Sequence, residues 1–488
     1  MAQGGWPIAQ YAAEQLAVAG PALRSRWCAL IAHIARVSAD PRAVALLFAA
    51  LEDADPRTRR TAASALGRMR AAGGEARLLE VLATERDVST LRAVVQSLGK
   101  LGGADSLREL DRLRAGDPET ARVLAEARMK LSRDHARGQP SEIDSAFTPA
   151  EPLEIFFHCR AGLESLVQAE LPAHFHASVR GPALVSARLE HALAQVFQSR
   201  VMTHVGFPLP EVPLADPAAL EAAVVSVLTS EYALSVLRAF TRGQLRYRLH
   251  WEGAGHRRGL TYRVASAVSA ACPELVNDPQ QSPWEARVSI THEKLRIELC
   301  PRRLDDPRFA YRVSDVPAAS HPTIAAALAR IGGVRAGDRV WDPCVGSGLE
   351  LVERGLLGPY AELWGTDLAE SALAAARKNL AAAGLARVQL VRADARSFTP
   401  PRPVDLIITN PPYGRRAQTG AELEQFYAAL LDRARQALAP AGRLVWISPL
   451  FETSVRIAEG LGLHGATRRR VDMGGFKAEL QMFHRERR

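Results

Sequence analysis

The sequence predicts a multidomain protein with an N-terminal α-solenoid, a middle α+β module and a C-terminal α/β domain. Three observations lead to this prediction. A helical segment repeats loosely within residues 1–138, and mixed strand and helix patterns fill residues 153–312. In residues 313–488, short β-branched apolar runs alternate with helical segments, which is typical of a parallel sheet covered by helices. A length of 488 residues also fits about three domains.

The N-terminal third contains an internal repeat. The stretch 51–67 recurs loosely as 82–99, so the pairs Leu66-Gly67 and Leu98-Gly99 lie 32 residues apart. A period near this length indicates a helical solenoid. The segment resembles HEAT-like repeats, including their Asp-Pro-x-x-Arg turn. Such repeats imply either a docking surface for protein or RNA, or a stabilising appendage without chemistry of its own.

The middle third mixes strand and helix patterns. Residues 139–152 are mostly polar, contain three prolines and follow Gly138, so we expect a linker there. A strand pattern begins at Leu153, residues 161–171 have amphipathic helical spacing, and Arg246–Trp251 alternates like a strand. With Gly162-Leu163-Glu164, this order resembles the front part of RNA methyltransferases that carry a THUMP domain. The resemblance implies a THUMP/ferredoxin-like, RNA-binding α+β module over residues 153–312.

Arginines with interleaved aromatic residues gather in this module. Cations beside aromatic rings suit single-stranded or folded RNA, although an alternating strand with a solvated Arg face gives the same pattern. Two further arginines follow Tyr413. The arginines expected to contact substrate RNA are Arg246, Arg248, Arg257, Arg258, Arg415 and Arg416.

Four successive strands of the C-terminal third close with a polar residue. These residues are Asp342, Asp367, Asp394 and Asn410. Open α/β sheets bind ligands outside the carboxyl ends of their strands. Any one of the four suits a helix N-cap, but four in succession favour a ligand site along one sheet edge.

A glycine turn follows the first of these strands. It reads Asp342-Pro343-Cys344-Val345-Gly346-Ser347-Gly348, and a helix pattern begins at Leu349. Glycines let the backbone turn tightly and approach a ligand. The third glycine of the dinucleotide fingerprint and the lysine of a phosphate-binding loop are both missing. We therefore expect a nucleoside ligand without phosphates.

The fourth strand, Val404–Thr409, runs into Asn410-Pro411-Pro412-Tyr413. An NH2 group on a base or an amide is a poor nucleophile because its lone pair is delocalised. The side-chain oxygen of Asn410 and the carbonyl of Pro411 can accept its two hydrogens and return electron density to nitrogen. Tyr413 can stack on a planar substrate. Proximity and a preorganised polar site would supply most of the catalysis.

These residues resemble the class I methyltransferases that use S-adenosylmethionine. The glycine turn resembles their first motif, with Leu349 where the family has Thr. The resemblance implies a Rossmann-like methyltransferase domain at 313–488 and S-adenosyl-L-methionine as cofactor. The implied cofactor-binding residues are Asp342, Gly346, Ser347, Gly348, Asp367, Asp394 and Asn410. The implied catalytic residues are Asn410, Pro411, Pro412 and Tyr413.

The order of the three parts resembles enzymes that methylate N2 of guanosine in tRNA or ribosomal RNA. Three alternatives stay open: an adenine-N6 methyltransferase acting on DNA or RNA, a protein-glutamine methyltransferase, and a non-catalytic HEAT-repeat adaptor. The expected partner is RNA, and a protein partner on the HEAT-like repeats is the second expectation.

Charge and composition limit the possible partners and the expected localisation of the protein. The net charge is +9, with +5 in residues 1–138, −1 in 139–312 and +5 in 313–488. Such an excess permits a polyanionic partner without demanding one. The chain has no apolar run of about eighteen residues and no signal-peptide pattern at its start. Its five cysteines are scattered singly. We therefore expect a cytoplasmic protein with no membrane segment and no metal site.

Overall fold

The structure is a computed structural model that describes residues 5–38, 40–253, 257–317, 319–413 and 420–486. Contacts between residues divide the chain into two compact units. The first comprises Met1–Ile143 and Leu209–Ile297, and the second comprises Asp144–Pro208 and Glu298–Arg488. Strand β11 (Lys294–Pro301) carries the chain from the first unit into the second. The domain boundaries expected from the sequence, at residues 138, 152 and 312, stay predictions.

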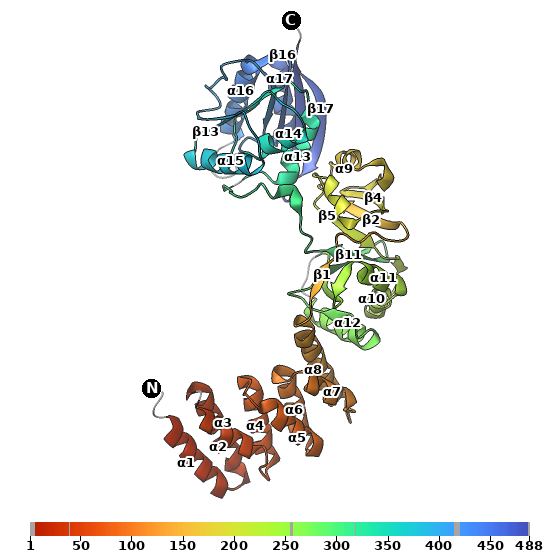
Figure 1. Cartoon of the computed structure of the whole chain (residues 1–488), viewed down its shortest axis with the longest axis vertical. Coiled ribbons are helices and arrows are strands. Elements are labelled where there is room, and N and C mark those ends of the chain that lie inside the picture. The colour runs from red at the N-terminus through yellow and green to blue at the C-terminus, as the bar shows by residue number, and fades with distance from the viewer. Residues whose placement is uncertain (1–4, 39, 254–256, 318, 414–419, 487–488) are drawn as a thin grey trace. The chain divides into compact units, whose positions relative to one another are not determined.

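The first unit begins with a row of helices, as the internal repeat predicted (Figure 1). The helices are α1 (Gly5–Val18), α2 (Pro21–Ser38), α3 (Pro41–Ala50), α4 (Pro56–Met69), α5 (Gly74–Thr84), α6 (Val88–Leu101), α7 (Ala104–Arg112) and α8 (Pro118–Arg137). Helices α2, α4, α6 and α8 pack side by side in that order. Each also contacts a helix from the second row, formed by α1, α3, α5 and α7.

The repeated Leu-Gly pairs mark the places where these helices cross. A Cβ atom on Gly67 of α4 would lie 2.4 Å from Cβ of Ser97 on α6. A Cβ atom on Gly99 of α6 would lie 2.8 Å from Cβ of Ala127 on α8. Glycine is therefore required at the same point of successive repeats because the next helix leaves no room for a side chain.

The rest of the first unit is the mixed module. Its elements are β1 (Ser141–Ile143), β6 (Val212–Pro213), η3 (Pro217–Ala219), α10 (Leu220–Leu228), α11 (Glu231–Ala239), β7 (Thr241–Gly243), β8 (Arg246–Trp251), α12 (Arg258–Ala271), β9 (Val276–Asn277) and β10 (Trp284–Thr291). Strand β8 has the bounds that the alternation predicted and pairs in parallel with β9 and β10. The α+β prediction for residues 153–312 is confirmed as a fold class, and these residues are divided between the two compact units.

The second unit opens with a small antiparallel sheet in the order β3-β4-β2-β5. Its elements are β2 (Leu153–His158), α9 (Glu164–Glu170), η1 (Ala173–Phe175), β3 (Ser178–Gly181), β4 (Leu184–Leu189), η2 (Leu193–Gln198) and β5 (His204–Pro208). A short turn, η4 (Pro307–Phe309), then leads toward the last domain of the chain.

The C-terminal domain is a seven-stranded sheet in the order β14-β13-β12-β15-β16-β18-β17. The strands are β12 (Arg339–Asp342), β13 (Glu362–Asp367), β14 (Val388–Arg392), β15 (Val404–Thr409), β16 (Leu438–Ser448), β17 (Leu463–Asp472) and β18 (Lys477–Arg485). The helices are α13 (Pro322–Gly332), α14 (Leu349–Leu357), α15 (Glu370–Ala382), α16 (Gly420–Ala437) and α17 (Phe451–Gly460). All strand pairs are parallel except those that β18 makes.

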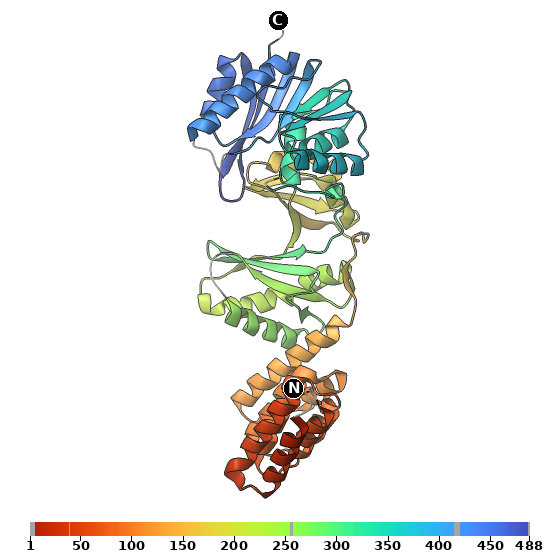
Figure 2. The ribbon, with the colours of Figure 1, turned by 90° about the vertical axis from the view of Figure 1, so that its left-hand side faces the viewer.

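Helices cover both faces of this sheet. In Figure 2 the blue strands have blue helices on one side and teal helices on the other. Successive side chains of a strand point to opposite faces. Trp341 and Ile407 join the core formed with α16 and α17. Leu406, the neighbour of Ile407, lies against Gly332 of α13 on the other face. Burial on both faces explains why the central strands read as continuous apolar runs.

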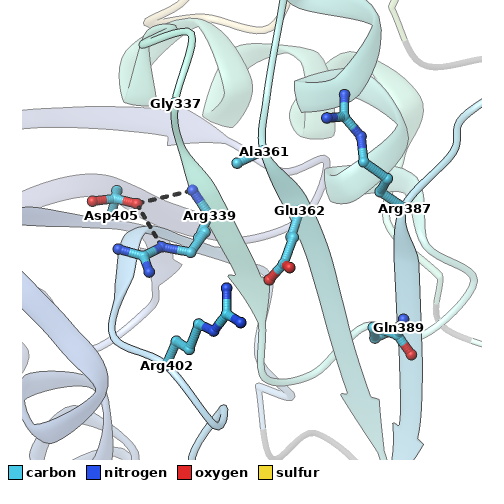
Figure 3. A pocket seen from close by; sticks show the side chains of 8 residues that line it. All are labelled: Gly337, Arg339, Ala361, Glu362, Arg387, Gln389, Arg402 and Asp405. Carbon is cyan, nitrogen blue, oxygen red and sulfur yellow. Dashed lines mark hydrogen bonds and ion pairs between the residues drawn. The ribbon is translucent and has the colours of Figure 1, made fainter.

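The amino ends of β12 to β15 border a charged hollow of about 600 Å³ (Figure 3). It is lined by Gly337, Arg339, Ala361, Glu362, Arg387, Gln389, Arg402 and Asp405. The Asp405 carboxylate accepts hydrogen bonds from the backbone N–H of Arg339 at 3.0 Å and from its Nε at 3.3 Å. This hollow lies at the opposite edge of the sheet from the polar strand ends, so it is separate from the predicted site.

No single helix in the described ranges is long and apolar enough to cross a membrane. The bent pair 217–228 and α11 passes that test by length and composition alone. Across the same ranges, no three or more His, Cys, Asp or Glu side chains are grouped so that they could hold a metal ion.

Gly162 gives a test of how the small sheet packs within the second unit. Its φ is +99°, and a Cβ atom there would lie 1.9 Å from the carbonyl oxygen of Arg470. We expect Gly162→Ala to lower the free energy of unfolding by about 2 kcal/mol or more, since strain and a backbone clash combine. Differential scanning calorimetry measures this. Gly181→Ala is the matched control, because nothing lies within 4 Å of that position. Equal transition temperatures for the two variants would contradict the prediction.

Candidate functional site

The structure gathers the polar strand ends at one edge of the C-terminal sheet. Asp342 and Asp367 end neighbouring strands, Asn410 directly follows β15 on the other side of β12, and Asp394 follows β14. Burial raises the pKa of the Cys344 thiol well above its usual value, and the nearby carboxylates of the three aspartates raise it further. These acids therefore surround Cys344. Its thiol stays protonated at neutral pH, which makes it a poor nucleophile.

The glycine turn leaves open space beside these acids. Gly346 has a φ of +49°, and the nearest atom to a Cβ built there is 4.0 Å away. Gly348 has a φ of +85° and caps α14, and a Cβ there would lie 3.2 Å from Ala376. The buried amide of Asn379 donates to the carbonyl of Ser347 and to that of Ser314, each at 2.8 Å. Asn379 therefore ties the turn to the segment before α13.

Asp367 and Asp394 are engaged in different ways. The Asp367 carboxylate accepts from the backbone N–H of Gly346 at 3.0 Å and from that of Ala369 at 2.9 Å. It therefore holds the glycine turn in place. Asp394 accepts from the Arg396 side chain, with Nη2 at 2.6 Å and Nε at 3.0 Å. Hydrogen bonds from Arg396 lower the pKa of Asp394, so a ligand that reaches Asp394 has to share it with Arg396.

Asp342 is fully buried at the end of β12. One of its oxygens accepts from the backbone N–H of Cys344 at 3.0 Å. The other oxygen and the hydroxyl of Thr409 at the end of β15 are buried without a well-formed hydrogen bond, although Thr409 lies close enough to lower the pKa of Asp342 in part. Burial, and then the nearby Glu350 carboxyl, raise the pKa of Asp342 well above its usual value. Buried polar atoms without partners require an explanation, and a ligand at this sheet edge would supply one.

Asn410 sits in a chain of hydrogen bonds that orients its amide. Its Nδ2 donates to the Ser320 hydroxyl at 2.5 Å, and Ser320 donates to a carboxylate oxygen of Glu350. On the other side, the Tyr413 hydroxyl donates to Oδ1 of Asn410. The Tyr413 ring also meets Phe476 edge to face, with ring centroids 5.3 Å apart. The amide oxygen therefore faces Tyr413 and the amide nitrogen faces Ser320.

Sequence reasoning missed Ser320 and Glu350. Glu350 is 3% exposed in the first turn of α14, directly after the glycine turn. Burial raises its pKa to about 7. The sequence signal that could have identified Glu350 is an acidic residue at a position of the helix that faces the core. Ser320 gives no signal, because only the fold brings it next to a residue ninety positions later.

The Asn-Pro-Pro-Tyr loop is anchored from the neighbouring helix as well. Tyr427 of α16 donates from its hydroxyl to the carbonyl of Pro412 at 3.2 Å. Pro411 is buried between Asn410 and Pro412. The structure therefore brings the four predicted catalytic residues together with the predicted cofactor-binding residues at one sheet edge.

Four of the predicted RNA-contacting arginines belong to the middle module, and the other two follow Tyr413 in the sequence. Arg246 is 3% exposed and donates to the carbonyl of Gln139, so its guanidinium is turned inward. Arg248 donates from Nε to Glu285 at 2.6 Å. Arg257 lies over the ring of Trp251 at 5.5 Å, and Arg258 is exposed at the start of α12. Arg415 and Arg416 lie outside the described residues. Among the positions described, Arg258 is the exposed arginine of this set, and Arg248 and Arg257 are half-buried.

The strand order, with antiparallel β18 between β16 and β17, defines the fold of a class I methyltransferase. Comparison with protein families agrees. Residues 310–478 match the family described as RMKL-like, methyltransferase domain, and residues 44–132 match HEAT repeats. The chain thus carries a methyltransferase domain of the RMKL-like family together with N-terminal HEAT repeats. The predictions of a C-terminal methyltransferase domain and of N-terminal HEAT-like repeats are confirmed by these matches.

Similar proteins include two curated tRNA enzymes. The tRNA (guanine(10)-N2)-dimethyltransferase of Methanothermobacter thermautotrophicus is 36% identical over 28% of this chain and 40% of its own length. The tRNA (guanine(6)-N2)-methyltransferase of Thermus thermophilus is 38% identical over 38% of this chain and 56% of its own length. The chain therefore matches only about half of the length of these relatives.

A solved structure covers more of the chain. TrmN from Thermus thermophilus superimposes with a TM-score of 0.55 and 25% identity, over 69% of this chain and 100% of its own. The predicted order of a small front module followed by a methyltransferase domain is thus shared with a known structure.

The raised pKa of Glu350 predicts how the stability of the folded chain depends on pH. Its pKa of about 7 in the folded chain lies above its ordinary value of 4.5. The folded state therefore binds the proton more tightly, so its stability is highest below pH 4.5 and falls as the pH rises through about 7. We expect Glu350→Gln, which stays neutral, to reduce the fall in transition temperature between pH 5 and pH 8.

Calorimetry at several pH values checks this expectation. Glu370→Gln removes an exposed carboxylate and is the control. A pH profile for Glu350→Gln that matches both wild type and control would contradict the assignment.

Proposed function

We propose that the protein transfers a methyl group from S-adenosylmethionine to the exocyclic N2 amine of a guanosine in tRNA or ribosomal RNA. The observation that carries the proposal is the oriented amide of Asn410, held by Ser320 and Tyr413, at the sheet edge beside the glycine turn. Two relatives named as guanine-N2 tRNA methyltransferases support the choice of guanine in RNA.

The residues at the sheet edge fit a nucleoside cofactor. Space for it exists beside Gly346, where no side chain intrudes, and the unpartnered oxygen of Asp342 lies at the same edge. We assign Gly346, Ser347 and Gly348 to the methionine part. Asp367 keeps acceptor capacity for ribose hydroxyls beyond its two backbone donors, and Asp394 is assigned to the adenine amine. S-adenosylmethionine, when bound, supplies a methyl group on a positively charged sulfur.

The Asn-Pro-Pro-Tyr loop would prepare the guanine amine for attack. Oδ1 of Asn410 and the carbonyl of Pro411 accept its two N–H groups, which localises the lone pair on nitrogen. Tyr413 gives up its hydrogen bond to Asn410 and stacks on the base. The amine held in this way could accept the methyl group that S-adenosylmethionine would supply, and the product nitrogen would lose a proton to solvent. A base inside a helix would first have to flip out.

The Ser320–Glu350 contact has a defined part in this scheme. When Glu350 is ionised, the Ser320 hydroxyl has to donate to it. Ser320 then offers only a lone pair to Asn410, which fixes the amide nitrogen on that side. The amide oxygen is therefore presented to the substrate without rotation during the reaction, which is the sense in which the polar site is preorganised.

We expect Asn410→Ala to lower kcat by about 10²- to 10³-fold, because it removes an acceptor that acts on the reacting nitrogen. Affinity for S-adenosylmethionine should change little, since the turn and the acids remain. Steady-state methylation of RNA and titration calorimetry with the cofactor measure the two effects. Equal losses of affinity and of kcat would argue against a role in amine activation.

Nucleoside mass spectrometry identifies the target. RNA from cells without the gene should lack N2-methylguanosine at one position or more, and the purified enzyme should restore it. Loss of N6-methyladenine instead would point to the adenine enzyme. A change in methylated glutamine with unchanged nucleic acids would point to a protein substrate. Failure to bind S-adenosylmethionine at millimolar concentration would support the adaptor.

Two substitutions of Tyr413 distinguish the contribution of its ring, which can stack, from that of its hydroxyl, which forms a hydrogen bond. Tyr413→Phe keeps the ring and frees Oδ1 of Asn410, so we expect kcat and KM for RNA within about threefold of wild type. Tyr413→Ala removes the stacking surface, which corresponds to a loss of about 1–3 kcal/mol and hence a kcat/KM lower by roughly 10- to 100-fold. Comparable losses in both variants would show that the hydroxyl, not the ring, matters.

A further inference from the structure

Three of the four helices in one row of the HEAT repeats carry basic residues and no acids, and α8, the fourth, carries both. Helices α2, α4 and α6, which pack side by side, contain three, four and two Lys or Arg residues, and no Asp or Glu. Helices α5 and α7 of the other row are different. They contain Glu75, Glu80, Asp105, Glu109 and Asp111 against three arginines. A general arginine bias of the chain does not explain why acids are missing from α2, α4 and α6 and abundant in α5 and α7.

Three of the cations are used to join successive repeats. Arg24 pairs with Asp53 at 2.5 Å, Arg59 with Glu85 at 2.8 Å, and Arg92 with Asp117 at 2.7 Å. These arginines are largely buried, with side chains 19% to 32% exposed, and their acids lie in the turns between helices. They hold the solenoid together.

The remaining six make what we name the basic face: Arg26, Arg36, Arg57, Arg60, Arg68 and Lys100. Lys100 is half-buried and the others are exposed. In the ranges that the structure describes, none of the six makes an ion pair. Nη1 of Arg60 on α4 donates to the hydroxyl of Ser89 on α6 at 2.8 Å. The exposed sides of these two helices therefore adjoin.

Helical spacing places the basic residues of α4 on one side. Arg57, Arg60 and Arg68 fall within about one quarter of the helix circumference at 100° per residue, opposite the buried Ala62 and Leu66. On α6, Ser89 and Lys100 share a side by the same spacing. Between the cations lie small or polar residues such as Ser64 and Gln96.

Helix stability does not account for this pattern. Arg36, Arg68 and Lys100 stand in the last turns of their helices, where a cation is favourable. Arg57 and Arg60 stand near the start of α4, where the helix dipole disfavours a cation by about 0.3–1 kcal/mol. They also repel each other at a spacing of three residues. All three helices have no acid in the first turn, where acids are favoured.

The residue types on the basic face indicate which class of partner it binds. Protein interfaces are centred on buried aromatic or apolar anchors, and the part of this face on α4 and α6 presents cations with small polar residues. Cations and hydroxyl groups are the usual contacts to a phosphate backbone. The N-cap residues Asp55 and Asp87 lie near Arg57 and Arg60. The six cations of the face outnumber these two acids, so a polyanion would reduce the repulsion that remains.

We propose that the basic face binds the phosphate backbone of the substrate RNA. This rests on the proposed function, because it names a second contact between the same enzyme and its RNA. The contact is electrostatic and independent of base sequence, and it acts on affinity without touching the reacting base.

The test compares two full-length variants with the same loss of charge. The first carries Arg26→Gln, Arg57→Gln, Arg60→Gln and Arg68→Gln on the basic face. The control carries Arg77→Gln, Arg108→Gln, Arg112→Gln and Arg122→Gln, four arginines that pair with acids elsewhere on the solenoid. Glutamine keeps good helix propensity. Circular dichroism and thermal unfolding establish that both variants are folded.

Equilibrium binding to unfractionated tRNA between 50 and 200 mM salt is the readout. Each lost phosphate contact lowers the slope of log Kd against log salt by about 0.7–0.9, so four contacts lower it by roughly 3. We expect at least a tenfold loss of affinity for the basic-face variant and less than a threefold loss for the control. Equal losses in both variants, or unchanged affinity and slope in the first, overturn the proposal. The unchanged result would assign the face to an acidic protein.

Measurements of kcat and of KM for RNA distinguish this proposal from the proposed function. With saturating RNA, the basic-face variant should retain the wild-type kcat and show a raised KM for RNA. Methylation with an unchanged KM overturns the basic face and leaves the proposed function standing. RNA binding that depends on the basic face, with no methylated guanosine formed by wild type, supports the face and overturns the assigned reaction.

Discussion

The methyltransferase sheet depends on one buried charge cluster around Asp338. This residue, 1% exposed, accepts hydrogen bonds from Arg354 at 2.7 Å and from Arg443 at 2.7 and 3.0 Å. Arg443 also donates to the carbonyl of Gly332 at the end of α13, and Arg354 to that of Gly358 after α14. Burial opposes ionisation of Asp338, but hydrogen bonds from the two arginines lower its pKa. Removing one partner of such a cluster leaves an uncompensated buried charge. Asp338 directly precedes β12 and Arg443 lies within β16, so the cluster fixes the position of these two strands relative to α13 and α14.

The active edge is built at the far ends of those strands, from segments distant in sequence. Asn379 ties the segment before α13 to the glycine turn, and Ser320 at the end of that segment meets Glu350 and Asn410. Each contact crosses between elements, so none depends on a single loop. This explains how one amide can be held in a defined orientation before any substrate arrives, which is the main requirement of catalysis by a preorganised polar site.

Much of this edge was predictable, because strand ends and turns obey local rules. The run Val404–Thr409 and the glycine turn have the structures expected of them, since apolar continuity and the need for positive φ act within a few residues. The arginines show the opposite case. Arg246 and Arg258 look alike in sequence, yet one is buried against Gln139 and the other is exposed. Whether a charged side chain serves packing or a ligand depends on neighbours that no local pattern contains.

The sequence by itself determined the order of elements, the helical repeats, the acid-ended strands and the chemistry offered by the Asn-Pro-Pro-Tyr loop. Periodicity, prolines and glycines act over short distances and can be read directly. The tertiary structure alone decided that Ser320 and Glu350 orient Asn410, that glycine recurs where helices cross, and that Arg60 of α4 reaches the exposed side of α6. Each of these features depends on which surfaces pack together. Packing joins elements that are tens of residues apart in the sequence, so no local pattern predicts it.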